Sequence, residues 1–287
     1  MTLFFRQFRC ELVKLFARKR TWMGFVAFLA LELLLLWLFQ LPNGERAFRH
    51  SMERNAGFSG MTLVFDEYFR GLTLAASVIL PTMFLLGALF LSLVSGDIVS
   101  KEAEDGTLRM TLCRPVSRLR VLAVKYLSCI TYTFTLTFFI GFSAMLVGWL
   151  WRGFGSIFVF LPEVKLFAVF PTGEGISRLS LALLFYAVSL CTVSSLAFLL
   201  SCTSAKPAAA TIMTLSIMLI DYILNLIPQF ESFRPYFLNA HMGTCLNVFR
   251  NPIPWDKMLI DYVYLFGVNA TFVIIGCGLF CRRDFKS

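Results

Sequence analysis

The stretch from Ser95 to Lys125 carries the side chains of this chain that are best placed for polar chemistry. Its carboxylates are followed by Gly106, which can end a helix because glycine takes the left-handed conformation without steric cost. Thr107 can then cap a second short helix bearing Leu108, and Pro115 ends that helix near residue 113 or 114. The pattern predicts two short surface helices that present carboxylates and apolar side chains to a partner. The carboxylates are those of Asp97, Glu102, Glu104 and Asp105.

The order of these residues resembles the cytoplasmic segment of ABC-2 type transporter permeases. There, acidic residues precede a Gly-Thr-Leu sequence, a Pro-Val-Ser-Arg sequence follows, and a lysine opens the third membrane helix. The matching positions here are Glu102, Glu104, Gly106, Thr107, Leu108, Pro115, Ser117 and Arg118, and then Lys125. The resemblance implies that residues 96–118 form a coupling segment that docks into a separate ATP-binding subunit. Ala103 and Thr111 depart from the family pattern, and an ordinary charged loop of another polytopic protein is the alternative.

The composition excludes an ordinary soluble domain. Hydrophobic residues make up 58% of the 287 and charged residues 15%, and the mean hydropathy is +0.75, whereas soluble chains carry about a quarter charged residues. About 20 apolar residues cross the hydrocarbon core of a bilayer. We therefore predict an all-α polytopic membrane protein, one transmembrane domain over residues 1–287. Six apolar runs fit as spans, at about 22–41, 72–95, 121–150, 179–201, 208–228 and 259–280.

Six spans would place both termini on one side of the membrane, and the basic residues indicate which side. The chain has a formal net charge of +9, and sixteen of its 26 Lys and Arg residues lie on the side of the termini. The positive-inside rule therefore predicts cytoplasmic termini, a cytoplasmic 96–118 segment and a multi-pass protein of the cell membrane. This distribution assigns the charge to the lipid bilayer rather than to nucleic acid.

Residues 2–20 predict a basic amphipathic helix in the membrane interface. ABC-2 permeases similarly begin with an interfacial elbow helix; the alternative is a frayed basic tail that only sets the topology. The cations that fall off the apolar face are Arg6, Arg9, Lys14 and Arg18. The apolar face is formed by Leu3, Phe4, Phe8, Leu12, Leu15 and Phe16.

Three further features concern the spans and their outer connections. Pro81 and Gly87 predict a kink in the second span. Residues 152–178 are predicted to be an outer loop. Residues 229–258 loosely resemble the outward segment before the last helix of ABC-2 permeases, which in that family often re-enters the outer leaflet as short helices.

Two carboxylates, Glu32 and Asp221, fall inside predicted spans. A carboxylate at that depth costs roughly 2.5–3.5 kcal/mol on insertion scales, so each must face protein or water. For Glu32 we favour a hydrogen bond that fastens helices together. The alternative is a functional site, in which Glu32 and Asp221 would serve a proton-coupled secondary transporter. The absence of a visible inverted repeat or broken helices argues against that alternative.

The motifs of common enzyme sites are missing from the chain. No glycine is followed by lysine, so the chain lacks a phosphate-binding loop and is not expected to be the ATPase itself. The resemblance implies that ATP binds to a separate partner subunit. HExxH and GxSxG are also missing, and His50 and His241 lie in predicted outer loops. We therefore expect no catalytic, cofactor-binding or metal-binding residue, and no enzyme activity, in this chain itself.

Taken with the resemblance, these features predict the permease subunit of an ATP-driven ABC transporter, expected to be an exporter. The family implies two permease chains, identical or paralogous, paired with two ATP-binding subunits. Closure of the ATP-binding subunits would move the coupling segments and repack the helices around the translocation pathway.

Overall fold

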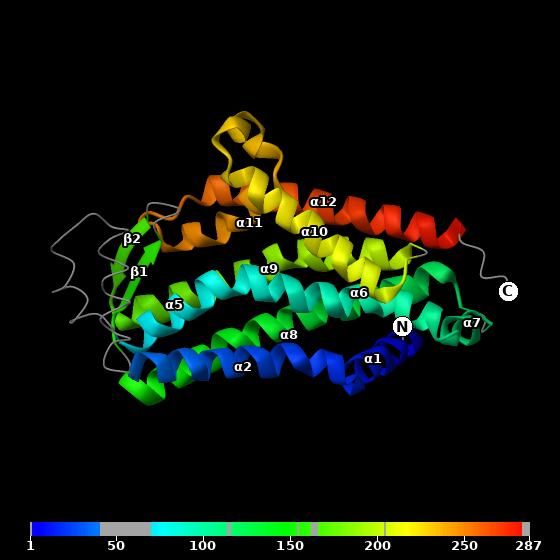
Figure 1. Cartoon of the computed structure of the whole chain (residues 1–287), viewed down its shortest axis with the longest axis horizontal. Coiled ribbons are helices and arrows are strands. Elements are labelled where there is room, and N and C mark those ends of the chain that lie inside the picture. The colour runs from blue at the N-terminus through cyan, green and yellow to red at the C-terminus, as the bar shows by residue number, and fades with distance from the viewer. Residues whose placement is uncertain are drawn as a thin grey trace.

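The structure is a computed structural model, and it describes residues 2–40, 70–113, 116–153, 155–161, 166–203 and 205–282. This part of the chain is largely helical and contains one β-hairpin (Figure 1). Its first half consists of α1 (Thr2–Ala17), α2 (Lys19–Gln40), α5 (Gly71–Thr82), the π-helical η1 (Met83–Gly87), α6 (Ala88–Glu104), α7 (Thr107–Leu112) and α8 (Arg118–Arg152). Its second half consists of β1 (Ile157–Leu161), β2 (Leu166–Phe170), α9 (Thr172–Cys202), α10 (Pro207–Leu226), the 3₁₀-helical η3 (Pro228–Tyr236), α11 (Leu238–Met242), the 3₁₀-helical η4 (Gly243–Phe249) and α12 (Trp255–Arg282).

Several helices are long and apolar enough to cross a membrane, which is compatible with a membrane protein. Among the described residues, α8, α9, α10 and α12 qualify singly. The bent pair formed by Gly71–Leu80 and Leu85–Glu104 makes a fifth span if it is counted as one. The first predicted span corresponds to α2, which is not among these. The pair bends by 53° at the π-helical η1, where the sequence predicts a kink.

Helix α9 forms the centre of the bundle, packed against α6, α8, α10 and α12. In its most apolar stretch 72% of the residues are buried, against 22% in α10 and 17% in α12. Its buried face is rich in small hydroxyl residues, which let neighbouring helices approach closely and hydrogen-bond. Thr133 of α8 pairs with Ser194 at 2.7 Å, and the Tyr186 hydroxyl donates to the Leu80 carbonyl at 3.1 Å.

The two ends of the bundle are built differently (Figure 1). Helix α1, helix α7 and the last turns of α12 lie at one end, and the β-hairpin lies at the other. The hairpin is antiparallel, with Ile157 opposite Phe170 and Leu161 opposite Leu166. The prediction of a loop over 152–178 is therefore wrong, because this stretch contains both strands and the first turns of α9.

Candidate functional site

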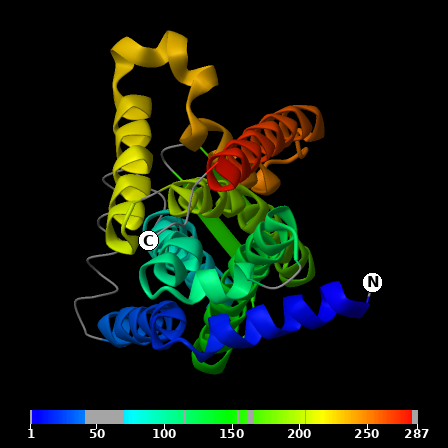
Figure 2. The same cartoon turned by 90° about the vertical axis from the view of Figure 1, so that its right-hand side faces the viewer.

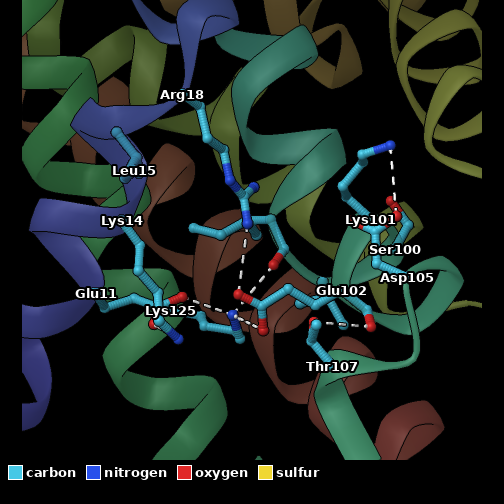
Figure 3. Close-up of polar contacts among 12 residues, drawn as sticks. Glu11, Lys14, Leu15, Arg18, Ser100, Lys101, Glu102, Asp105, Thr107 and Lys125 are labelled. Carbon is cyan, nitrogen blue, oxygen red and sulfur yellow. Dashed lines mark hydrogen bonds and ion pairs between the residues drawn. The ribbon is translucent and has the colours of Figure 1, made fainter.

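A buried lysine joins three helices at the end of the bundle where α1 and α7 lie (Figure 3). The Lys125 side chain, on α8, is only 2% exposed. Its Nζ donates to Glu11 Oε1 of α1 at 2.6 Å and to the Ile98 carbonyl of α6 at 3.2 Å. It also pairs with Glu102 Oε2 of α6 at 2.7 Å. An ammonium group has three N–H donors, so these three acceptors satisfy it completely.

Further cations come from α1 and the residue that follows it. Arg18 Nη2 donates to Glu102 Oε1 at 3.4 Å, and Lys14 Nζ lies 3.5 Å from Glu11 Oε2. Each of the two carboxylates therefore meets two cations, which offsets the cost of burying the charges. We refer to Glu11, Arg18, Glu102 and Lys125 as the charged cluster.

A second contact ties the start of α2 to α6. Arg20 Nη1 donates to Asp97 Oδ2 at 2.8 Å, and the Asp97 side chain is buried. Asp97 and Glu102 lie five residues apart on α6. Arg20 and Arg18, which follow α1 in sequence, therefore contact α6 at two positions along its length.

The pKa of Glu11 reflects the balance of forces in the charged cluster. Burial raises the pKa of this carboxyl, but the positive charge and hydrogen bond of Lys125 lower it by more, with Lys14 and Arg18 adding to the effect. The net result is a pKa below the ordinary value of 4.5. Glu11 is therefore held in its ionised form.

The exposed surface next to the charged cluster is the turn between α6 and α7. Helix α6 ends at Glu104, and Gly106 follows with φ of 72°, the left-handed conformation that the sequence predicts. Thr107 opens α7, and its hydroxyl donates to the Glu102 carbonyl at 3.4 Å. We define the α6–α7 turn as Glu104, Asp105, Gly106 and Thr107, all of them exposed, together with the exposed Met110 on α7.

The structure corrects two expectations for this segment. Residues 97–104 are not a separate surface helix, because they are the last turns of α6 and continue the bent span. Glu102 and Leu108 were expected to point outward, but they are 6% and 0% exposed and point into the protein. Glu102 is drawn inward by Lys125, and Leu108 packs in the hydrophobic core.

The remaining residues of the predicted segment lie around the start of α8. Ser117 occupies the N-cap position of α8, where its carbonyl accepts from the backbone N–H of Arg120 and Val121, without a side-chain cap. Arg118 Nη1 donates to the Cys281 carbonyl near the end of α12 at 3.0 Å. Pro115 lies outside the described residues.

The apolar face of α1 also differs from the expectation. Leu15 is buried and Phe4, Phe8, Leu12 and Phe16 are partly buried, so most of the stripe packs within the protein rather than against lipid. Helix α1 contacts α8 and α2 through this side. The opposite side, which includes Arg6, Arg9 and Val13, is exposed.

Among the described residues, the hydrogen-bond partners of Glu32 and Asp221 differ from each other and are not members of the charged cluster. Glu32 is buried on α2, and its Oε1 accepts a hydrogen bond from Ser143 Oγ of α8 at 2.9 Å. Its Oε2 has no hydrogen-bond partner among the described residues. Asp221 accepts from the backbone N–H of Leu238 and Asn239 at 3.0 and 2.7 Å, and from Asn239 Nδ2 at 2.7 Å. Asp221 therefore caps the start of α11.

A second carboxylate holds the same connection from the other side. Asp261 of α12 accepts from Thr244 Oγ1 at 2.7 Å and lies 2.8 Å from His241 Nδ1. Sequence analysis placed His241 in a loop and missed both contacts. These residues are 17 and 20 positions from Asp261, so no local pattern indicates the pairing.

Sequence comparison assigns the chain to a family. A family model described as "Protein of unknown function (DUF2705)" matches residues 33–286. The chain belongs to the DUF2705 family. The matched region includes Glu102 and Lys125 and begins after Glu11 and Arg18. The uncharacterized protein YhcI of Bacillus subtilis (strain 168) is 23% identical over 208 residues, which cover 70% of this DUF2705 chain and 65% of YhcI. No solved structure matches the chain.

Replacing Lys125 tests the energetic importance of the charged cluster. Lys125→Met should destabilise the protein by about 3–5 kcal/mol, because Glu11 and Glu102 would remain buried without their shared cation. The matched control is Lys101→Met, which should cost less than about 1 kcal/mol, since the ion pairs of Lys101 among the described residues are with the exposed Glu104 and Asp105. Thermal unfolding in detergent measures both variants. Equal midpoints for the two would contradict a structural role for the cluster.

The lowered pKa of Glu11 predicts how α1 responds to acid. The stability that ionised Glu11 contributes is complete above its ordinary pKa of 4.5 and is lost as the pH falls through the lower folded-state value. Amide hydrogen exchange of residues 2–17, corrected for the intrinsic rate, should therefore show less protection of α1 at pH values below about 4.5. Glu11→Gln should remove this part of the acid dependence. The same acid response in both proteins would show that Glu11 does not anchor α1.

Proposed function

We propose that this chain is the membrane subunit of an ATP-driven ABC transporter, an exporter whose ATP-binding subunit is a separate chain. The observation that carries the proposal is the exposed α6–α7 turn, which the buried charged cluster fixes to helices that are long and apolar enough to cross a membrane. A partner that displaces this turn must also displace α6, and the Glu102–Lys125 pair passes that displacement to α8. Coupling of a soluble motor to a membrane pathway requires such a connection.

The shape of the second predicted span indicates which helices would move together and where the chain would bend. From η1 to Glu104, α6 is one continuous helix, so it transmits displacement along its length without a break. The bend lies at η1, and π-helical turns often occur at functional sites. We propose that ATP-driven closure of the partner moves α6 and α8 together and that the chain flexes at η1. Because α6 also packs against α9 and α10, this movement would repack the pathway.

The proposed coupling roles divide the predicted residues into two groups. Glu104, Gly106, Thr107 and Arg118 would contribute to the contact surface, because they are exposed. Glu102 and Leu108 would act by fixing the turn to the protein. Ser117 would set the start of α8, and Pro115 would retain the role that the resemblance gives it.

The wider arrangement proposed for the membrane keeps six spans. Helix α2 would be the first, since its 22 residues correspond to about 33 Å of helix. The termini and the α6–α7 turn would face the cytoplasm, and α1 would be the elbow helix. The exposed apolar faces of α10 and α12 would meet lipid and a second permease chain, identical or paralogous.

One observation favours the alternative of a proton-coupled transporter. Glu32 is a buried carboxylate with one oxygen unpartnered among the described residues. Asp221 lends no such support, because both of its oxygens accept hydrogen bonds at the start of α11. The ABC proposal requires of Glu32 only a hydrogen bond between helices, whereas the proton-coupled transporter requires its carboxyl group to take up and release a proton.

The Glu32→Gln substitution separates these proposals. Glutamine retains an acceptor for Ser143 Oγ, so the ABC proposal expects normal expression and an unchanged rate of ATP hydrolysis when the complex is reconstituted in vesicles. The measurement for the alternative is proton flux into vesicles that contain this chain alone under an imposed pH gradient. A flux that is abolished by Glu32→Gln would support the proton-coupled transporter instead.

Substitution of Gly106 tests the docking surface. A Cβ at Gly106 would have no described atom within 4 Å, so only the backbone conformation is affected. Gly106→Val should force the turn to change, because a left-handed conformation costs a side chain of this kind about 1–2 kcal/mol. Gly106→Asn is the matched control, since asparagine tolerates this conformation. We expect both variants to reach the membrane, and only Gly106→Val to lose the ATP-binding subunit on affinity purification.

Charge reversal at the same surface gives a second readout of this test. Glu104→Lys replaces an exposed carboxylate whose ion-pair partner among the described residues is the partly exposed Lys101, so folding should be unaffected and association with the ATP-binding subunit weakened. The subunit is identified by mass spectrometry of proteins that purify with the wild-type chain. Wild-type association in both Gly106→Val and Glu104→Lys would refute docking at the α6–α7 turn.

A further inference from the structure

A histidine on α11 connects η3 to α12, and the proposed coupling gives it no role. The Nδ1 atom of His241 lies 2.8 Å from Asp261 Oδ1 on α12, and its Nε2 atom lies 2.8 Å from the carbonyl oxygen of Pro235 on η3. Its ring stacks on that of Tyr264, with the ring centroids 4.2 Å apart. Both views show the connection that contains η3 at the periphery of the bundle, away from the central helix α9 (Figures 1 and 2). His241 is therefore a direct link between this connection and a helix of the bundle.

Both ring nitrogens of His241 face oxygen atoms that accept hydrogen bonds. A neutral imidazole has one N–H group and one nitrogen that can only accept, whereas an imidazolium has two N–H groups. A carbonyl oxygen cannot donate, so Nε2 must carry a hydrogen in order to bond to Pro235. Nδ1 and the carboxylate of Asp261 then need a second proton between them. The arrangement therefore contains one proton more than a neutral histidine and an ionised aspartate.

The surroundings of the ring are complementary to a positive charge. The face of an aromatic ring attracts a cation that stacks on it, as Tyr264 does here. The Pro235 carbonyl belongs to the last turn of η3, and the end of a helix that carries unpaired carbonyls favours a cation. We place the additional proton on His241, because an imidazole ordinarily binds a proton more tightly than a carboxyl group does.

The elements packed against α11 carry other titratable and charged groups. Those that bond to other residues include Asp221 on α10, Arg234 on η3, Cys245 on η4, Arg178 on α9 and Tyr262 on α12. Those that are exposed include Tyr222 on α10, Glu231 and Tyr236 on η3, Glu174 on α9, and Asp256 and Lys257 on α12. Among the described residues, the hydrogen bonds of His241 go to Asp261 and Pro235. A change in the charge of the ring therefore acts on these two bonds first.

Loss of the additional proton breaks one of the two hydrogen bonds. The bond to the Asp261 carboxylate is the stronger one, because a charged acceptor strengthens a hydrogen bond. The remaining hydrogen therefore stays on Nδ1, and the lone pair of Nε2 then faces the Pro235 carbonyl, so that two acceptors repel each other. The His241 side chain is 14% exposed, so its ring can exchange protons with water. An imidazole ordinarily changes charge between about pH 5 and about pH 8, so the Pro235 contact is complete below this range and is lost as the pH rises through it.

We propose that His241 and Asp261 form a proton-binding site that controls the attachment of η3 to α12. With the proton bound, the hydrogen bond from His241 to the Pro235 carbonyl holds η3. Once the proton is lost, the polar contact that remains between described residues of η3 and α12 is the 3.3 Å hydrogen bond from the Tyr264 hydroxyl to the Tyr236 carbonyl. Helices α10 and α12 are both long and apolar enough to cross a membrane, so the site makes the connection between two such helices dependent on pH. This inference needs neither an ATP-binding partner nor a transported proton, and it stands or falls separately from the proposed function.

The charge of the ring can be measured directly, because the chain contains two histidines, His50 and His241. The full chain with His50→Gln and ¹⁵N-labelled histidine, in nanodiscs of phosphatidylcholine and phosphatidylglycerol, gives the NMR signals of His241 alone. We expect hydrogen on both ring nitrogens at about pH 5 and on one of them at about pH 8. A ring that keeps a single protonation state throughout this range would overturn the proposal.

The distance between η3 and α12 gives the structural readout. Spin labels are attached to p-acetylphenylalanine, because the chain has eight cysteines of its own. They replace Ser232 on η3 and Ile260 on α12, both of them exposed, and double electron–electron resonance measures their separation in the same nanodiscs. We expect one narrow distribution of distances at about pH 5 and a severalfold broader one at about pH 8. Distributions of equal width at the two pH values would contradict the proposal.

Two further substitutions in the spin-labelled chain assign the pH dependence to His241. His241→Phe retains a ring that can stack on Tyr264 but neither donates a hydrogen bond nor takes up a proton, so the distribution should be broad at both pH values. Tyr264→Phe is the matched control, since it removes the bond to the Tyr236 carbonyl and leaves His241 able to titrate. It should keep the difference between the two pH values. The same pH dependence in His241→Phe as in the chain with His241 would refute the site. The NMR measurement does not depend on whether His241→Phe folds.

Discussion

The ammonium group of Lys125 is the interaction on which one end of this molecule depends. A buried cation needs hydrogen-bond acceptors. Lys125 lies on α8, and its acceptors are Glu11 of α1 and the Ile98 carbonyl and Glu102 of α6. Displacing any of the three helices would break at least one of these contacts to the Lys125 ammonium group. The relative positions of α1, α6 and α8 are therefore set by charge pairing as well as by apolar packing.

This constraint decides which parts of the α6–α7 region are available to a partner. Glu102 is used inside the protein, so its neighbours Glu104 and Asp105 remain exposed at the end of the helix. Gly106 then turns the chain, and Leu108 returns it to the core. The turn is consequently short and fixed on both sides, a geometry suited to passing a displacement into the membrane helices.

At the other face of the bundle, carboxylates on spanning helices also fix an irregular connection. Asp221 of α10 caps the start of α11, and Asp261 of α12 accepts from Thr244 just after it. These two helices diverge in Figure 2, and the connection between them is held from both sides. Backbone N–H groups at a helix start need acceptors, and Asp221 supplies them for Leu238 and Asn239.

The sequence by itself determined the features that depend on neighbouring residues alone. Runs of apolar residues predicted the four helices that are long and apolar enough to cross a membrane, or five with the bent pair, among the described residues. Gly106 predicted the end of α6, since its backbone takes a positive φ. The kink at η1 followed in the same way from Pro81 and Gly87.

Only the tertiary structure decided where side chains point and which distant residues meet. Glu11 and Lys125 are 114 positions apart, and nothing near either residue indicates the other. The inward direction of Glu102 and the packing of the α1 stripe against the protein have the same origin, because an amphipathic pattern shows that a face is apolar but not what covers it. The pairing of residues 157–161 with residues 166–170 was missed since these strands are short and stabilised by pairing with each other. Burial of a charge is a property of the assembled helices, so its partners could be identified only after the fold was known.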